Sequence, residues 1–253
     1  MRVKTRSLAA CLGRNFRRLE CTHLSTEKIK NSLLALLLAD SALQPDLKPV
    51  CMALSAGPLV FDFSGSDRFI YFPVDALMTL GPANSSNAVL AVVGWHGCVA
   101  SGQTESSAIQ SHVMVPGQAY RLDWSVVAQD PARYTAWLWH TTAATHGQME
   151  QMAQTAFCVQ HHHATQRLAS WLLMCLAQYG GDDLVLPLAC LPASILASAA
   201  DLQNTLQTLE SQGALAWRDA HIEQLHAGRL VALACRCHTM VRHTVDVPPL
   251  QRL

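Results

Sequence analysis

The stretch "LPASILASAADLQNTLQTLESQG", residues 191–213, has the pattern of a short helix, a tight turn and a second helix. It contains no Lys, Arg or His. A helix-turn-helix that reads DNA ordinarily carries positive charge, because phosphate contacts supply much of its affinity. The sequence on either side of this stretch therefore has to show whether it belongs to a DNA-binding unit.

The flanking segments predict a winged helix. The preceding segment, "ATQRLASWLLMCLAQYG", has its large apolar residues on one helical face, and Gly180 and Gly181 end that helix. After the quoted stretch, "ALAWRD" and "HIEQL" could pair as a small hairpin, and a last helix is expected through "GRLVALACRCHTM". A helix, a helix-turn-helix and a two-stranded wing, in that order, describe a winged helix.

The N-terminal half has a different periodicity. Residues 31–57 look helical, whereas from 58 to about 124 short apolar runs such as "RFIYFPV" and "ALMTL" alternate with turn residues. This spacing predicts a compact antiparallel roll or barrel. The expected fold class is therefore α+β, with an N-terminal antiparallel β-roll of the jelly-roll kind, a long helix after Pro131 and a C-terminal winged helix-turn-helix.

Apolar and small residues recur at alternating steps of four and three in the long helix, which is the spacing of a coiled-coil seam. Threonines weaken the first half of this seam, so the roll would have to help. We expect a homodimer whose interface is formed by Leu138, Thr142, Thr145, Met149, Met152 and Ala156.

Composition limits the classes of protein. Half of the 253 residues are hydrophobic and 14% are charged, which is enough to bury large cores. No apolar run reaches the ~18–20 residues that a membrane span needs, so no membrane association is expected. The nine cysteines are odd in number and scattered, unlike a disulfide scaffold, and this favours a reducing, cytoplasmic location.

Charge is unevenly distributed along the chain. Residues 1–30 hold eight of the eighteen Lys and Arg against two acids, leaving ten basic and sixteen acidic residues, a net of −6, in 31–253. The basic segment could be a transit-like segment, a nucleic-acid arm or an extension that contributes nothing to the fold. We favour the extension.

The chain resembles the Crp/Fnr family of transcription regulators. The resemblance lies in "YFPVDALMTL" (71–80), "VGWHGCVA" (93–100), "CVQHHHATQRLASWLLM" (158–174) and "HIEQLHAGRLVALACRCH" (221–238). It implies a β-roll that senses an effector over 31–130, a dimerisation helix over 131–162 and a DNA-binding-like winged helix over 163–253. It implies no cofactor.

Few of the residues with which the family contacts DNA are kept in this sequence. The apolar frame of the helix-turn-helix is kept, but the positions at which relatives carry arginine and threonine are Ala199 and Asp201 here. The side chains that could still contact DNA are Ser198, Gln203, Asn204, Gln207, Arg218 and His221. DNA binding is expected to be weak or altered in specificity.

The effector is unknown. A cyclic-nucleotide roll of this family holds the phosphate with a Gly-Glu pair and an arginine, whereas "GCVASGQTESSA" (97–108) has Cys98 at the acidic position and no arginine. Cyclic nucleotide binding is therefore not expected. An iron–sulfur sensor would need a tight N-terminal cysteine cluster, and Cys11 and Cys21 lie ten residues apart.

The sequence contains two groups of possible metal ligands, and neither is assigned as a metal site. Cys158 and His162 lie at i, i+4 and could share one ion, but His161, His162 and His163 cannot all face it on a helix. Cys235 and Cys237 alone lack the second half of a structural zinc site. His162 is interpreted as a residue of the junction between the two domains.

Three functions remain open. The first is a dimeric DNA-binding regulator that responds to an unknown effector. The second is a Crp-like dimer that no longer reads DNA and acts through protein contacts. The third is a metal or redox sensor using Cys158, His162, Cys235 and His238. The chain has no phosphate loop, metalloprotease motif or nucleophile elbow, so no enzyme activity is expected.

We predict that cyclic AMP or cyclic GMP at millimolar concentration leaves the melting temperature unchanged, because residues 97–108 offer no arginine to a phosphodiester. A ligand that binds only the folded state stabilises it by about 2.7 kcal/mol at one hundred times its Kd. Thermal unfolding with and without the nucleotide measures this, and a shift of several degrees would contradict the prediction.

Overall fold

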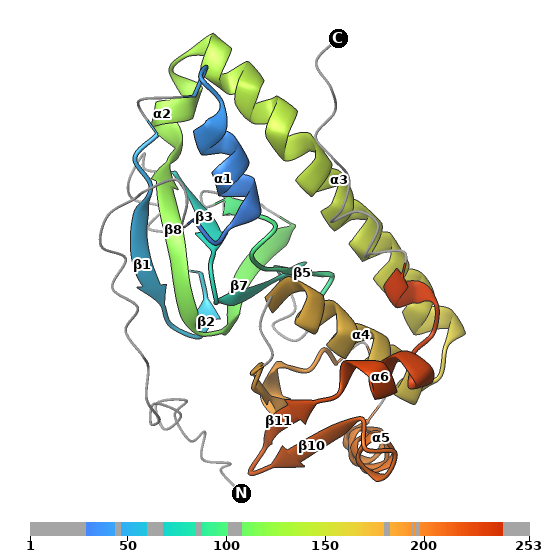
Figure 1. Ribbon diagram of the computed structural model, residues 1–253. Helices are drawn as coiled ribbons and strands as arrows, with labels where there is room; N and C mark the ends of the chain where they lie inside the picture. Colours follow the sequence, from blue (N-terminus) through green and yellow to red (C-terminus); the bar gives the residue numbers. More distant parts are fainter. Residues whose placement is uncertain are drawn as a thin grey trace, which may run out of the picture.

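The computed structural model describes residues 29–43, 47–59, 68–83, 88–100, 108–179, 183–193, 195 and 198–239. The expected basic extension lies outside the described residues except for its last two positions. Figure 1 shows a β-roll on one side, a long helix running diagonally beside it, and a smaller unit of helices and a hairpin below. The predicted α+β class is confirmed.

The roll consists of two four-stranded antiparallel sheets, in the orders β1-β8-β3-β6 and β2-β7-β4-β5. Its strands are β1 (Val50–Leu54), β2 (Gly57–Pro58), β3 (Phe69–Pro73), β4 (Leu77–Pro82), β5 (Ala91–Val93), β6 (Val99–Ala100), β7 (Ile109–Val115) and β8 (Gly117–Asp123). The side chains that meet between the two sheets, among them Tyr71, Met78 and Val113, are buried. The apolar runs in the sequence are thus short because each strand crosses a small roll.

The helix predicted for residues 31–57 is wrong beyond its first turns. Helix α1 spans Ser32–Ala39 and ends at Asp40, and Val50–Leu54 is strand β1, paired with β8. Pro45 and Pro49 keep a helix from continuing into this strand, because the residue before a proline avoids the helical region and proline cannot donate within a helix.

Asn31 connects α1 to the roll. Its side-chain oxygen accepts a hydrogen bond from the backbone N–H of Leu34 at 2.9 Å, which caps the helix. Its amide nitrogen donates to the backbone oxygens of Pro73 at 2.9 Å and Gly97 at 3.0 Å. The residue is fully buried, so one amide satisfies three backbone groups from three segments.

The long helix, α3, spans Pro131–His161 and follows the short helix α2 (Trp124–Ala128). Asp130 caps α3 by accepting from the backbone N–H groups of Ala132 and Arg133, and these bonds lower the pKa of its carboxyl group. Trp137 packs edge-on against Phe72 of the roll and against Trp124. The start of α3 is therefore held by the roll. No helix among the described residues is long and apolar enough to cross a membrane.

The C-terminal unit is a winged helix. It comprises α4 (Ala164–Tyr179), β9 (Leu186–Pro187), the 3-10 helix η3 (Leu188–Cys190), α5 (Ala199–Ser211), β10 (Leu215–Arg218), β11 (His221–Leu225) and α6 (Ala227–Leu233). The wing hairpin β10–β11 is extended by β9 into a three-stranded antiparallel sheet. The predicted hairpin is confirmed.

Two helices of this unit are shorter than the sequence predicts. In the described part of 184–198, the helix before α5 is only the 3-10 helix η3. A backbone hydrogen bond from Ile195 to Pro192 follows it. Pro187 and Pro192 have no backbone N–H to donate, which limits a longer helix here. The last helix, α6, ends with an extended Ala234. Beyond it the backbone N–H of Cys235 bonds to the hydroxyl of Ser170, which turns the chain out of the helix.

The roll and the winged helix share one hydrophobic core. Leu77, Val92 and Met114 of the roll are buried together with Leu168 and Leu172 of α4. At the contact, the backbone N–H of Gly94 donates to the side-chain oxygen of Gln178 at 3.1 Å, and that of Trp95 to its backbone oxygen at 3.1 Å. A Cβ at position 94 would overlap this backbone oxygen, so only glycine allows the approach.

Replacing Asn31 with Ala is predicted to lower the free energy of unfolding by about 3 kcal/mol, because it removes a helix cap and leaves two buried carbonyls unsatisfied. Asn31→Asp keeps the cap but cannot donate to Pro73 and Gly97. We expect it to lose part of this free energy when its carboxyl group is protonated, and more when the carboxylate is buried in its charged form. Denaturant unfolding measures both. Equal stability of Asn31→Ala and the unaltered chain would contradict this account.

Candidate functional site

Helix α5 presents to solvent a polar face that carries no basic residue. Gln203, Asn204 and Gln207 are exposed, while Leu206 and Leu209 are buried in the shared core. The amphipathic pattern of the sequence thus places three of the six predicted DNA contacts on one open face. Amides at such a position can bond base edges in the major groove, but they neutralise no phosphate.

Ser198 has a structural task at the start of α5. Its hydroxyl accepts from the backbone N–H of Asp201 at 3.1 Å and donates to the Asp201 carboxylate at 2.9 Å. The hydroxyl thus caps the helix and also fixes the Asp201 side chain beside the helix N-terminus. This carboxylate puts a negative charge in the first turn, where the family resemblance implies phosphate contacts.

The wing carries the other two predicted contacts. Arg218 is exposed at the end of β10, and His221 is half-buried at the start of β11. Nδ1 of His221 lies 2.9 Å from the backbone oxygen of Asp219, so this nitrogen is directed toward the turn of the hairpin. Asp219 and Ala220 have φ of 48° and 64°, the paired left-handed conformation of a tight hairpin.

One face of α3 exposes apolar side chains in the single chain. Leu138 is 46% exposed, Met149 61% and Phe157 50%, and Thr142, Thr145 and Ala156 are also exposed. Met152 differs, because it is half-buried and packs against the core of the roll. Five of the six predicted interface residues therefore lie open to solvent, and the sixth contacts its own roll.

The stretch that would correspond to the phosphate site is described only to Ala100 and at Ala108. Burial raises the pKa of the Cys98 thiol to about 12, so the position of the family's acid holds a neutral group. The side-chain amide of Gln148 donates to the backbone oxygen of Cys98 at 3.2 Å, which links this stretch to α3.

Four possible metal ligands meet where the end of α3 contacts the segment after α6. They are Cys158, His162, Cys235 and Cys237, and their ligand atoms all lie within 4.8 Å of one another. The sulfurs of Cys158 and Cys235 are 3.5 Å apart, and the Cys237 sulfur lies 3.6 Å from Nδ1 of His162. The three cysteines are free thiols, each at most 7% exposed.

The sequence indicated all four residues in separate groups, but the metal or redox sensor that it suggested used His238 in place of Cys237. The structure turns His238 away, since its Nδ1 bonds to the backbone oxygen of Cys235 at 2.6 Å. His161 also lies outside the cluster and stacks on Phe157. The Cys-x-Cys spacing was the signal for Cys237, because two thiols so close in sequence can bind the same ion.

Protonation within the cluster is uneven. Burial, together with the neighbouring thiols, raises the pKa of Cys158 well above its usual range and also raises the pKa of Cys237. Burial acts in the same direction on Cys235, but hydrogen bonds from the Ser170 hydroxyl and the Cys237 backbone outweigh it and lower its pKa. Of the three thiols, that of Cys235 is therefore the one that loses its proton most readily.

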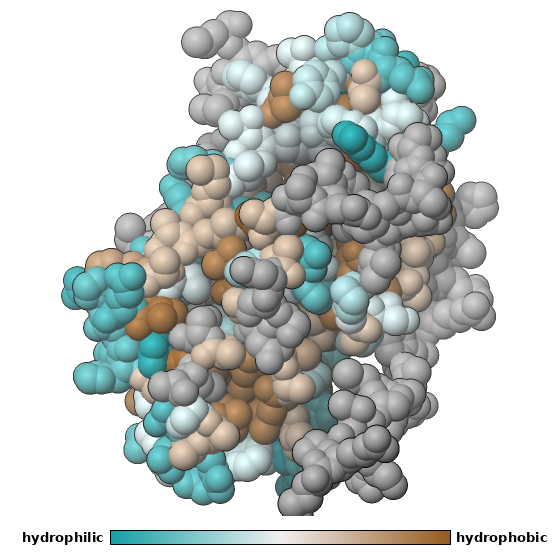
Figure 2. Space-filling model, turned by 180° about the vertical axis from the view of Figure 1, so that it is seen from behind, coloured by the Kyte–Doolittle hydropathy of each residue, from teal (hydrophilic) through white to brown (hydrophobic). Residues whose placement is uncertain are grey.

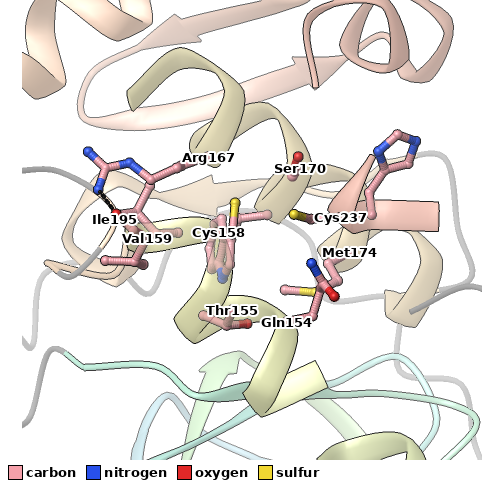
Figure 3. A pocket seen from close by; sticks show the side chains of 11 residues that line it. Gln154, Thr155, Cys158, Val159, Arg167, Ser170, Met174, Ile195 and Cys237 are labelled. Atoms are coloured by element: carbon pink, nitrogen blue, oxygen red, sulfur yellow. Dashed lines mark hydrogen bonds between the residues drawn. The ribbon is translucent and has the colours of Figure 1, made fainter. Parts of the chain in front are cut away.

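A cavity of about 30 Å³ adjoins this cluster. Figure 3 shows the sulfur of Cys237 directed toward Cys158 at its edge, with Ser170, Met174 and Gln154 nearby. Its lining is almost entirely apolar, although the indole N–H of Trp171 and Nε of Arg167 are buried there without a partner.

Comparison with known proteins supports the fold. No family model matches the chain, and no curated protein does. FixK2 from Bradyrhizobium japonicum matches with a TM-score of 0.52 and 16% identity, over 75% of this chain and 98% of that one. A transcriptional regulator of the CRP/FNR family from Thermus thermophilus matches with 0.51 and 15%, over 73% and 97%.

A third similar structure is CLP, a c-di-GMP-responsive global regulator from Xanthomonas campestris, with a TM-score of 0.50 and 11% identity, over 77% of this chain and 98% of that one. At these identities the similarity shows the fold. The chain has the fold of Crp/Fnr transcription regulators, as its sequence motifs predicted.

Proposed function

We propose that this protein is a dimeric transcription regulator of the Crp/Fnr type that binds DNA through a divergent winged helix. The observation that carries the proposal is helix α5, which exposes Gln203, Asn204 and Gln207 on a winged-helix unit. The apolar side of this helix packs in the core, and its amide side is open to solvent. Its amides suit base edges, and Arg218 on the wing suits a phosphate.

The charge distribution makes this binding weak. Each good bidentate arginine contact to guanine contributes about 1–3 kcal/mol of discrimination, and α5 offers none. Asp201 in its first turn repels phosphate, since the helix N-terminus otherwise attracts anions. The same carboxylate favours the second candidate function, a dimer that has lost DNA reading and acts through protein contacts.

The dimer interface is proposed on the exposed face of α3. The exposed apolar residues of this 31-residue helix are spaced as in a coiled-coil seam. Figure 2, which views the molecule from behind relative to Figure 1, shows that further hydrophobic residues reach the surface there. We assign the partner to α3 because its exposed apolar residues follow a helical seam.

Met149→Glu is predicted to raise the dimer dissociation constant at least about tenfold, because it would bury an unpaired charge in the seam. Ala132→Glu adds the same charge to an exposed position of α3 before the seam and should leave the constant unchanged. Equilibrium sedimentation measures both variants. A monomer at micromolar concentration for the unaltered chain would exclude the proposed dimer.

Ala199→Arg is predicted to strengthen duplex DNA binding about tenfold and to steepen its salt dependence by about one ion, because position 199 starts α5 and is exposed. Ser211→Arg adds the same charge at the other end of α5 and should have the smaller effect. The sites would first be selected from a random DNA pool at low salt with the unaltered protein.

Three outcomes of this selection are informative. Enrichment of a site with micromolar affinity supports the proposal. Nanomolar, salt-sensitive binding by the unaltered protein would show that the amides and the wing suffice and that binding is not weak. Complete failure at low salt, also for Ala199→Arg, would overturn DNA binding and leave the protein-contact function.

A further inference from the structure

The side chains of Cys158, His162, Cys235 and Cys237 form a complete set of four ligands, and we propose that they bind one Zn²⁺ ion. The four atoms come from two segments far apart in the chain: the last turn of α3 with its C-cap, and the residues just after α6. Cys158 and Cys235 are separated by 77 positions in the sequence, so no local pattern brings them together.

The distances fit a tetrahedron. With Zn–S bonds of about 2.3 Å and Zn–N of about 2.0–2.1 Å, neighbouring ligand atoms lie about 3.8 Å (S to S) or about 3.6 Å (S to N) apart. The separations here are 3.5 Å between two sulfurs and 3.6 Å from sulfur to nitrogen, and no pair exceeds 4.8 Å. A disulfide would need sulfurs at about 2.05 Å.

The donor chemistry selects the metal. Three thiolates and one imidazole in a tetrahedral arrangement are typical of zinc, whereas Mg²⁺ and Ca²⁺ prefer oxygen. All four positions are supplied by the protein, so the ion would be closed to substrate and structural in kind. Binding requires that the thiols lose their protons. The Zn²⁺ ion then supplies the positive charge that balances the buried thiolates.

Neighbouring groups are arranged to hold the ligands. The Ser170 hydroxyl lies 3.0 Å from the sulfur of Cys235 and accepts from its backbone N–H at 3.2 Å. The backbone N–H of Cys237 and the side chain of Gln154 bond to Cys235 and Cys237, respectively. Hydrogen bonds of this kind orient metal ligands and stabilise thiolate charge.

The ion would fix the junction between the dimer helix and the winged helix. His162 ends α3 with an extended backbone, and α4 begins two residues later. A metal that joins this turn to the segment after α6 sets the angle at which the winged helix leaves the dimer axis. The metal site follows from side-chain geometry alone, and only its effect on DNA binding rests on the proposed function.

The test uses the full chain, purified under reducing conditions without chelator. We expect close to one zinc per chain by elemental analysis. After removal of the metal, Co²⁺ should restore the absorption bands of tetrahedral cobalt with thiolate charge transfer, and Zn²⁺ should displace it. Competition with a zinc-sensitive dye then measures the zinc dissociation constant.

Matched variants identify the ligands. Cys237→Ser and His162→Ala should each raise the zinc dissociation constant on the order of 100-fold, the effect of losing one of four ligands. Cys175→Ser, a buried thiol outside the cluster, and His163→Ala, beside His162, should leave it unchanged. His238→Ala should also leave it unchanged, which separates this ligand set from the one with His238.

Each outcome bears on the proposal. If a ligand variant fails to fold, cobalt spectra and thiol counting on the unaltered chain still decide, because zinc should protect three thiols from modification. Zinc binding no tighter than micromolar, a native Cys158–Cys235 disulfide, stoichiometric iron in place of zinc, or equal loss with His238→Ala would overturn it. DNA binding is measured separately, so its failure leaves the metal result intact.

Discussion

The close contact between Gly94 and Gln178 holds the two halves of this molecule together. Here the backbone of the roll touches the last turn of α4 without a side chain between them, and both Gln178 oxygens accept hydrogen bonds from the roll. Burying these groups without partners would cost free energy, so the contact is specific in position as well as close. The common core of roll and winged helix forms around it.

Helix α3 depends on the same arrangement. The side chain of Gln151 is buried, and its oxygen accepts a hydrogen bond from the backbone N–H of Val92 at 2.7 Å. Val92 lies two residues before Gly94. Met152 packs onto the roll beside it. The face of α3 directed at the roll is thus occupied, whereas Leu138 and Met149 are exposed to solvent.

The Cys–His cluster acts on the other end of α4. Gln178 anchors the C-terminal end of this helix to the roll, while Ser170 contacts Cys235 within the proposed zinc site. The two contacts lie about two turns apart on one helix. Helix α5 packs on the same helix.

The sequence by itself determined the class and order of the elements. Short apolar runs predicted the roll, a long periodic segment after Pro131 predicted α3, and the absence of basic residues in 191–213 is a property of the composition that no fold can alter. These features could be read because burial repeats with the period of each element. Residues 50–54 were misread because a short apolar run is compatible with helix or strand.

Only the tertiary structure decided how side chains from distant segments meet. It made Ser198 a helix cap, turned Met152 toward the roll, and brought Cys237 in place of His238 to the cluster with Cys158. The physical reason is that a ligand set or a close backbone approach depends on where segments many residues apart lie in space. Local periodicity carries no record of that distance.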